Sequence, residues 1–367
     1  MEKKLLCITS GSYVYGAESV VLKVIGGLTN NNFKIFCAVN GWNDGAFIRE
    51  LEKLKVPYKA IYLGWFYITK PLWTLDTIVH FPKAYFQYYN ILKRSDSKFV
   101  YHYDYRSLFL LLPFLKKNNV YHVHATINTK MAKFILKYID KKIVYYVACS
   151  NSIAKELIEF GIEKKKIKLI YNGVDFTNDL PQQNNNIIPT VFKIGIVGQI
   201  NENKGQLVLI NALAIVVKTF KNFKVHIFGT GDDALIKKLK ELIEVNDLSD
   251  NIIWEGYVKD KSKIYYDLDF CVVPTLLTEA YGLVAVEPAV YYKPVIASKC
   301  GGLPEIVQDG ETGLLFSPGD INELAEKLLY YFNNPGSIVS MGQKANEIYS
   351  KKFSETQMID EFNNLLQ

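Results

Sequence analysis

Two glutamates stand where two strand-to-helix corners would meet. Glu279 lies in the loop after the apolar run Phe270–Val273, and Glu287 follows eight residues later in an amphipathic run. A second glycine-rich corner, at 301–302, follows a short strand predicted at 294–298. Ligands of open α/β sheets bind outside the carboxyl ends of the strands, so the two corners predict a ligand crevice. The carboxylates could serve hydrolysis or bind the adjacent hydroxyls of a polyol, and two solvated surface glutamates are the alternative.

A glycine-rich loop at 198–205, GQINENKG, joins a predicted strand to a predicted helix. Gly198 lets a ligand approach the backbone closely, and Lys204 at the start of the helix can reach a phosphate at the helix N-terminus. The residue order of a P-loop, GxxxxGK[ST], is absent. An ordinary loop with a solvated lysine is the alternative interpretation.

The first strand of the chain, predicted at 4–9, ends in a comparable loop. In SGSYVYGAE two glycines bracket a turn, and Gly16 stands just before a helix predicted at 17–28. A strand, a glycine loop and a helix together offer backbone N–H groups to an anion. Because the spacing is not GxGxxG, a tight turn without a ligand fits the pattern equally well.

Two sets of residues could suggest a metal. His122 and His124 share one face of a predicted strand that His124 ends, but no further ligand stands nearby in the sequence. We therefore prefer His124 as a polar group at the crevice, with a hydrogen-bonded core histidine as the alternative. Asp267 and Asp269 precede the strand that follows them, which puts this pair at the amino end, away from the ligand side. The prediction is that there is no metal site.

Strand-like apolar runs alternate with helical patterns along the chain, which favours parallel sheets with helices on both faces. The polar segment 178–189, NDLPQQNNNIIP, is the best candidate for a domain boundary. The predicted fold class is α/β, with two doubly wound Rossmann-like domains facing across a deep cleft. The predicted parts are a first domain at 1–180, a second at 190–352 and a last helix at 353–367.

Composition limits the classes of protein to consider. The 367 residues exceed what one hydrophobic core usually supports, and 49% hydrophobic with 22% charged residues is globular. The net charge of +6 is too small to argue for nucleic acid. The five cysteines form no CxxC pair, which indicates reduced thiols and a cytoplasmic protein. No apolar run approaches the length of a transmembrane helix.

Aromatic residues interleaved with Lys and Arg fill the segment 62–89. Such a stretch could rest on a lipid interface or bind an apolar acceptor. A helix that packs its aromatic side chains on the core is the alternative. We expect a protein that is soluble or sits peripherally on a membrane surface.

Several stretches resemble, in the right order, landmarks of the retaining GT-B glycosyltransferases of glycosyltransferase family 4. In the second half they are VGQINENKGQ, TEAYGLVAVEP and GGLPEIVQDGETGLLFSPGD, preceded by VACSNSIAKELIEFGIEKKKIKLIYNGVD at 147–175. Nearer the N-terminus only YGAE at 15–18 and VHATINTK at 123–130 match. The resemblance covers nearly the whole chain and implies a GT-B fold whose second domain holds most of a nucleotide-sugar donor.

This resemblance implies roles for residues of the acidic loop. Glu279 and Glu287 match the family's Glu-x7-Glu pattern. By that match Glu279 would contact the hydroxyls of the donor sugar, and Glu287 those of the ribose. Backbone N–H groups around Tyr281, Gly282 and Leu283 would bind sugar or diphosphate oxygens.

It also implies roles elsewhere in the chain. Lys204, beside Gly198 in the first loop of the second domain, would pair with the diphosphate. Gly16 would approach the diphosphate from the first domain, and His124 resembles the family's cleft histidine near the reacting sugar. The last helix would cross back onto the first domain.

The sequence departs from the family at two positions. Gln199, counted here among the donor-binding residues, stands where the family usually has Arg, so one diphosphate cation is missing and Lys130 or Lys299 could replace it. Pro288 follows Glu287 where Ala is common, and proline disfavours helical geometry in the residue before it. Glu287 is therefore expected in the first turn of a helix or beside a kink.

Together these features predict a cytoplasmic retaining glycosyltransferase that uses no metal and no cofactor. Its donor would be a nucleoside-diphosphate sugar, UDP favoured and GDP possible, carrying a hexose-type sugar. Its acceptor would be a glycan or glycolipid of a cell-surface polysaccharide pathway, with peripheral membrane contact and no nucleic acid. The alternatives are a GT-B sugar-nucleotide epimerase and an inactive GT-B partner subunit.

Overall fold

The computed structural model describes residues 3–9, 11, 13–66, 71–127, 129–177 and 189–367. The chain divides into two compact units, one of Met1–Gly173 with Glu355–Gln367 and one of Val174–Ser354. The division falls just before the polar segment 178–189, and of that segment only Pro189 lies among the described residues.

The first unit is built on a seven-stranded sheet with the order β3-β2-β1-β4-β5-β6-β7, in which all neighbouring strands are parallel. Its central strands are buried on both faces, which explains why they read in the sequence as continuous apolar runs. The strands are β1 (Lys3–Thr9), β2 (Phe33–Asn40), β3 (Tyr58–Ile61), β4 (Phe99–His102), β5 (Asn119–Val123), β6 (Ile143–Ala148) and β7 (Ile167–Leu169).

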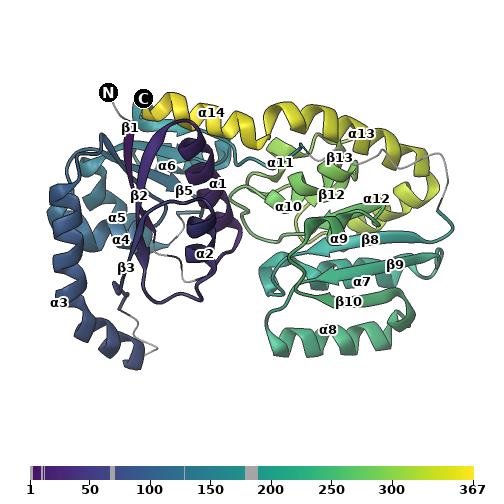
Figure 1. Cartoon of the computed structure of the whole chain (residues 1–367). Coiled ribbons are helices and arrows are strands. Elements are labelled where there is room, and N and C mark those ends of the chain that lie inside the picture. The colour runs from purple at the N-terminus through teal and green to yellow at the C-terminus, as the bar shows by residue number, and fades with distance from the viewer. Residues whose placement is uncertain (1–2, 10, 12, 67–70, 128, 178–188) are drawn as a thin grey trace. The chain divides into compact units, whose positions relative to one another are not determined.

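Helices cover both faces of this sheet (Figure 1). Right-handed crossovers put α1 and α2 on one face and α3 to α6 on the other, because the strand order reverses after β3. The α-helices are α1 (Gly16–Asn30), α2 (Ala46–Lys53), α3 (Pro71–Arg94), α4 (Tyr105–Leu111), α5 (Lys130–Ile139), α6 (Asn151–Glu159) and α14 (Glu355–Leu366). Short 3-10 turns are η1 (Leu112–Phe114), η2 (Asp140–Lys142) and η3 (Lys164–Lys166).

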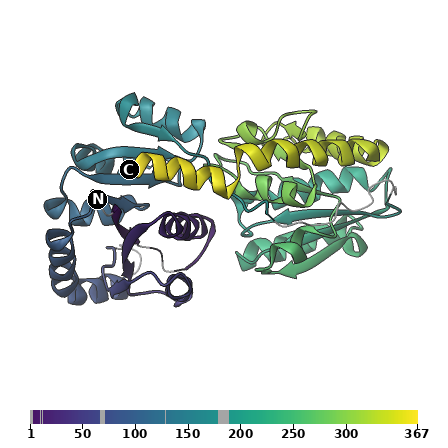
Figure 2. The ribbon, with the colours of Figure 1, turned by 45° about the horizontal axis from the view of Figure 1, so that its top comes forward.

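The last helix, α14, belongs to the first unit although it follows the second unit in the chain (Figure 2). It packs against α1 so closely that a Cβ atom on Gly27 would lie 2.3 Å from Ile359 Cδ1. The Phe362 ring of α14 lies 6.0 Å from the ring of Tyr101 and 5.1 Å from that of His122. This helix therefore completes the core of the first unit.

The second unit has a six-stranded parallel sheet with the order β10-β9-β8-β11-β12-β13. The direction of winding reverses between β8 and β11, so the carboxyl ends of these two strands form the switch point where open sheets bind ligands. The strands are β8 (Phe192–Val197), β9 (Phe223–Phe228), β10 (Ile252–Gly256), β11 (Phe270–Val273), β12 (Val295–Ser298) and β13 (Gly313–Phe316).

The helices of the second unit pack on an aromatic core in which Phe332 lies against Phe192, Phe220 and Phe223. They are α7 (Gln206–Val216), α8 (Asp233–Val245), α9 (Lys261–Tyr265), α10 (Leu283–Val286), α11 (Leu303–Ile306), α12 (Ile321–Asn333) and α13 (Pro335–Lys352). The 3-10 turns are η4 (Glu202–Lys204), η5 (Ser249–Asn251) and η6 (Glu287–Tyr291).

Three details differ from the sequence predictions. Strand β5 ends at Val123, so His124 follows the strand and does not end it. The strand Gly313–Phe316 was not predicted, because four residues after a turn carry too little periodicity. In the aromatic segment 62–89, residues 62–66 form a loop and residues 71–89 belong to the long helix α3, which holds Pro82 in its interior. In the described part of the chain, no helix is long and apolar enough to cross a membrane.

Candidate active site

The switch point of the second unit brings together two residues that are 75 positions apart in the sequence. Lys204 Nζ lies 2.6 Å from Glu279 Oε2, and the two form a salt bridge. Their side chains are 29% and 18% exposed, so the pair is half-buried and still accessible to a ligand. The sequence placed each residue at the end of its own strand, and the structure shows that these ends meet.

The loop after β8 is shaped by glycines and a cap. Gly198 has a φ of +148°, and Gly205 has a φ of +71°. A Cβ atom on Gly205 would lie 1.8 Å from the carbonyl oxygen of Pro274, so only glycine allows this approach to the end of β11. Asn201 caps the turn η4, because its side-chain oxygen accepts a hydrogen bond from Lys204 N at 3.1 Å. These contacts fix the backbone from which Lys204 projects.

Asn203 joins this loop to the loop after β11. Its carbonyl oxygen accepts a hydrogen bond from Leu276 N at 2.8 Å, and its side-chain oxygen accepts one from Leu277 N at 2.7 Å. Asn203 was not predicted from the sequence as part of the site. Its only signal was an asparagine in a loop, and such residues bond to backbone groups wherever the fold places them.

The backbone at Glu279 is held by the glycine corner after β12. Gly302 N donates to the carbonyl oxygen of Glu279 at 2.8 Å. Gly301 has a φ of +55°, and a Cβ atom there would lie 2.0 Å from the same oxygen. Gly282, with a φ of +103°, is the N-cap of α10. The loop that holds Glu279 and the glycine corner at 301–302 were predicted to lie together, and they are joined by direct contact between their backbones.

Other residues predicted for the site lie around this pair. Tyr281 is 3% exposed and packs against Phe353, so only its backbone could face a ligand. Leu283 begins α10. Gln199 is exposed, and its carbonyl oxygen accepts a hydrogen bond from the buried Gln206 Nε2 at 3.2 Å. Gln206, which the sequence analysis did not single out, thus fixes the backbone of the loop.

Glu287 lies at the junction where α10 becomes the 3-10 turn η6. The prediction of a kink beside Pro288 matches this change of helix type, although Glu287 itself keeps helical angles of −54° and −41°. Its Oε2 atom accepts hydrogen bonds from Lys261 Nζ at 2.8 Å and from Tyr265 Oη at 2.7 Å. Lys261 and Tyr265 were missed, and their only signal was a spacing of four that puts them on one side of α9.

In the first unit, Gly16 is the first residue of α1, and Tyr15 is its N-cap. Glu18 Oε2 accepts a hydrogen bond from Tyr15 N at 3.1 Å. Burial raises the pKa of the Glu18 carboxyl above its usual range. The helix end that the sequence offered to an anion is thus partly occupied by a carboxyl group of the protein itself.

His124 lies beside His122, with 3.8 Å between the ring centroids. Burial lowers the pKa of His124 to about 3, so the ring is neutral at physiological pH. Its Nε2 atom is buried and has no hydrogen-bond partner among the residues that the structure describes. His122 is bonded through Nδ1 to Tyr101 Oη at 2.7 Å, and its buried Nε2 atom likewise has no partner among the described residues. His124 is therefore a neutral polar group with one nitrogen unused.

Asp269 bonds to the backbone of Lys193 at the amino ends of β11 and β8, where the sequence analysis put it. Within the described ranges, no group of three or more His, Cys, Asp or Glu side chains is arranged to hold a metal ion. The two lysines considered as substitutes for the absent arginine, Lys130 and Lys299, are both exposed. Lys130 begins α5 in the first unit, and Lys299 follows β12.

Comparison with known protein families covers both units. A family model described as glycosyl transferases group 1 matches residues 191–334, and one described as Glycosyltransferase Family 4 matches residues 14–178. The chain belongs to glycosyltransferase family 4. The predicted family is thereby confirmed.

The relatives of this family-4 chain are distant. An uncharacterized glycosyltransferase of Methanocaldococcus jannaschii is 32% identical over 57% of this chain and 55% of its own length. The capsular polysaccharide biosynthesis glycosyltransferase CapM of Staphylococcus aureus is 26% identical over 60% of this chain and 62% of its own. The chain thus spans little more than half the length of these curated relatives.

Among solved structures, the Anabaena protein HepE in complex with UDP and glucose has a TM-score of 0.80 at 20% identity, and the match covers 99% of both chains. At this identity the likeness concerns the fold. It confirms the predicted α/β class with the GT-B arrangement of two Rossmann-like sheets.

Proposed function

We propose that this family-4 chain is a retaining glycosyltransferase. It moves a hexose-type sugar from a nucleoside-diphosphate sugar, UDP-linked in preference to GDP-linked, to a glycan or lipid-linked acceptor. The product belongs to a cell-surface polysaccharide. The reaction takes place on the cytoplasmic side of the plasma membrane, with the enzyme in peripheral contact with it.

The salt bridge between Lys204 and Glu279 carries this proposal. A nucleotide sugar presents an anionic diphosphate joined to a ring of hydroxyl groups. A cation and a carboxylate that are 2.6 Å apart match these two parts in order. As the glycosidic bond to the diphosphate breaks, negative charge collects on the leaving group, and a preset cation stabilises it. Glu279 accepts hydrogen bonds from the sugar hydroxyls and orients the ring.

The surrounding residues take the roles that the family resemblance implies. Backbone N–H groups at Gly282 and Leu283 bind oxygens of the donor, and Gly198 lets the diphosphate approach the loop after β8. Glu287 binds the ribose hydroxyls through Oε1, which accepts no hydrogen bond from the described residues, while Lys261 and Tyr265 hold Oε2.

For the first unit, the family resemblance assigns Gly16 to the diphosphate and His124 to the reacting sugar. The neutral imidazole of His124, with its unused Nε2, suits a hydrogen bond to a hydroxyl group and not a proton transfer near pH 7. Retention follows if the acceptor attacks from the face that the diphosphate leaves. Charge on the diphosphate is balanced by Lys204 and helix ends without a metal.

Similar proteins support the proposed substrates. HepE was solved in complex with UDP and glucose, and CapM is named for capsular polysaccharide biosynthesis. Neither name specifies the sugar or the acceptor of this chain, so the donor has to be found by experiment.

A thermal-shift screen of UDP- and GDP-sugars tests the proposal. A ligand that binds only the folded protein at a hundred times its Kd adds about 2.7 kcal/mol of stability, which is several degrees in melting temperature. We expect at least one UDP-sugar to give such a shift and the Lys204→Ala variant to lose most of it. The exposed Lys237→Ala variant, on helix α8, serves as a control and should keep it.

Failure of every sugar nucleotide to shift the melting temperature would refute the donor site and favour an inactive partner subunit. Mass spectrometry of donor incubated alone separates transfer from epimerisation, because an epimerase converts the donor without an acceptor. EDTA should leave transfer intact, and loss of activity would contradict the metal-independent mechanism.

A further inference from the structure

Helix α5 of the first unit presents two kinds of side chain on its exposed side. The residues of each kind recur at spacings of three and four, which puts them along one side of the helix. The lysines are Lys130, Lys133 and Lys137, all exposed. The apolar residues are Met131, Phe134 and Tyr138, which are 52%, 55% and 50% exposed. Helix α5 thus exposes large apolar side chains to solvent beside its lysine side chains.

The charge of this surface is not balanced locally. Helix α5 has the sequence KMAKFILKYI, which contains no acidic residue. None of its three lysines forms an ion pair within the part of the chain that the structure describes. A solvated helix normally carries mixed charges. The exposed side of α5 therefore departs from an ordinary surface helix.

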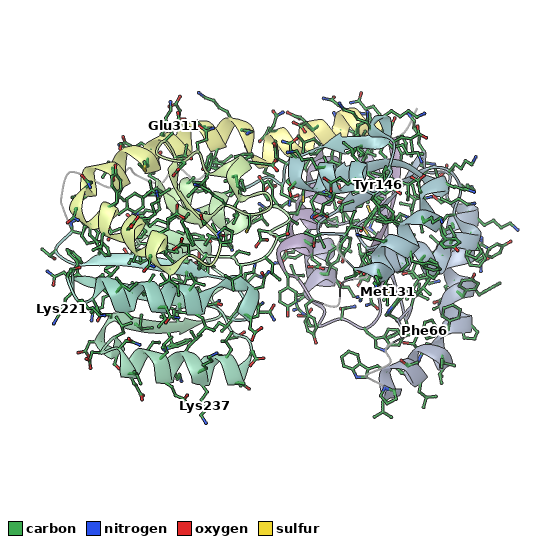
Figure 3. The ribbon with its side chains drawn as sticks, turned by 180° about the vertical axis from the view of Figure 1, so that it is seen from behind. Phe66, Met131, Tyr146, Lys221, Lys237 and Glu311 are labelled. Carbon is green, nitrogen blue, oxygen red and sulfur yellow. The ribbon has the colours of Figure 1, made fainter. Side chains whose placement is uncertain are left out.

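The apolar character continues into the neighbouring helices of the same layer. The ring of Phe134 lies 6.5 Å from Phe109 of α4, and Phe114 of η1 lies 4.3 Å from Tyr85 of α3. Figure 3, where Met131 is labelled, shows its side chain on the surface of this layer. Helix α3 adds exposed apolar side chains at Leu75 and elsewhere along its length, which are Leu72, Trp73, Ile78, Val79 and Phe86. Patches of this extent mark contact surfaces.

Charge is also divided unequally between the two units. The first unit contains 26 of the 43 Lys and Arg residues but only 15 of the 37 Asp and Glu residues. The second unit consequently has an excess of acidic residues, although the whole chain has a net charge of +6. An anionic surface would therefore attract the first unit and not the second.

We propose that the layer of α3, α4 and α5 rests on a bilayer that contains anionic lipids. The lysines of α5 lie at the level of the lipid phosphates, with their aliphatic stems along the apolar side chains. Phe134 and Met131 enter the boundary between headgroups and acyl chains, as in other helices that lie in the membrane plane. Nucleic acid also attracts cations, but it would leave the aliphatic side chains of α3 and α5 in water.

Vesicle cosedimentation with the full chain tests this proposal, and it does not depend on sugar transfer. We expect the wild type to bind vesicles of phosphatidylcholine with phosphatidylglycerol and to bind phosphatidylcholine alone far more weakly. Each lysine near an anionic surface contributes about a fivefold factor to partitioning. The triple variant Lys130→Gln, Lys133→Gln, Lys137→Gln should lose about 100-fold, and the double variant Met131→Ser, Phe134→Ser at least about tenfold.

The matched control is the triple variant Lys237→Gln, Lys238→Gln, Lys240→Gln on helix α8 of the second unit, where all three lysines are exposed (Figure 3 labels Lys237). It removes the same charge and should bind anionic vesicles like the wild type. The proposal would be overturned if both triple variants lost vesicle binding equally. It would also be overturned if binding were the same with and without phosphatidylglycerol. A dimer in vesicle-free sedimentation that the Met131→Ser, Phe134→Ser variant dissociates would overturn it too, because the face would then belong to a second copy.

Discussion

The two units hold their candidate site residues in place by different kinds of contact. In the second unit, glycines bring backbone against backbone: Cβ atoms on Gly205 and Gly301 would lie 1.8 Å and 2.0 Å from the carbonyl oxygens of Pro274 and Glu279. In the first unit, side chains pack around Gly11, which precedes α1. A Cβ atom on Gly11 would meet the hydroxyl of Tyr103 and the carboxylate of Glu18.

This difference shows how one fold can keep the local geometry of one unit and vary that of the other. A backbone contact survives almost any change of side chain, so the geometry around Lys204 and Glu279 is set by a few glycines. A loop packed by side chains changes shape with every substitution. The stretches that resemble the family accordingly lie mostly in the second half of the chain, and the first unit presents its own surface.

The largest effect is expected from Glu279→Ala. The variant removes the carboxylate that we propose orients the donor sugar, and we expect kcat for sugar transfer to fall by about 10³-fold. Transfer of a labelled sugar measures it, and the melting temperature should stay within about 2 °C of the wild type. The exposed Glu311→Ala in the same unit is the matched control, and full activity in Glu279→Ala would end the assignment of the site.

The next largest effect concerns stability. Two glycine substitutions distinguish the cost of losing a backbone contact from the cost of a positive φ alone. Gly301 and Gly310 both have a positive φ, +55° and +77°, but only Gly301 faces another backbone. Gly301→Ala should cost about 3 kcal/mol of unfolding free energy from strain and displacement of Glu279, against about 1 kcal/mol for Gly310→Ala. Denaturant titration measures both, and equal costs would show that contact with Glu279 is unimportant.

The first unit should be the more sensitive to acid. Burial lowers the pKa of His102 to about 4 and that of His124 to about 3. Below pH 6.5 these histidines become protonated in the unfolded chain but stay neutral in the folded unit. The free energy of unfolding therefore decreases as the pH falls. Between pH 7 and pH 4.5 each of these buried histidines lowers the free energy of unfolding by about 2 kcal/mol.

Calorimetry over this pH range checks the expectation on the wild type, on His124→Gln and on the control His80→Gln, whose side chain is 41% exposed. The His124→Gln variant should lose less stability on acidification than the wild type, and His80→Gln should behave like the wild type. An acid sensitivity that is the same in all three proteins would contradict the role of burial.

The smallest effect concerns product binding. In the free protein Glu279 neutralises Lys204, so UDP without a sugar has to compete with this carboxylate. Glu279→Gln removes the competitor, and we expect UDP to bind about fivefold more tightly, in line with about 1 kcal/mol for a half-exposed ion pair. Titration calorimetry with UDP measures the change. Weaker binding of UDP would show instead that Glu279 supports the diphosphate site.

Sequence reasoning succeeded where a residue's role follows from its position on an element. Strand β11 was predicted with its observed bounds, because an apolar run ended by proline has few other interpretations. The meeting of Lys204 with Glu279 follows from the same rule, since both follow the ends of strands at the switch point. Pro288 indicated a kink beside Glu287, which lies where α10 changes into the 3-10 turn η6.

The sequence could not predict contacts that depend on packing between elements. Asn203 ties two loops together, and Lys261 and Tyr265 reach Glu287 from a helix of five residues. Their positions depend on how α9 and η4 pack against neighbours that are distant in the chain. The partial occupation of the α1 end by Glu18 was also invisible, because YGAE reads as an open loop followed by a helix.

Helix α14 has a consequence for synthesis of the protein. The 12 residues Glu355–Leu366 emerge from the ribosome after the whole second unit, yet Phe362 packs on strands made early in translation. The core of the first unit therefore stays incomplete, with Tyr101 and His122 not covered by Phe362, while the second unit is made and folds. A nonsense mutation that stops translation just before Glu355 would consequently damage the half of the molecule that was translated first.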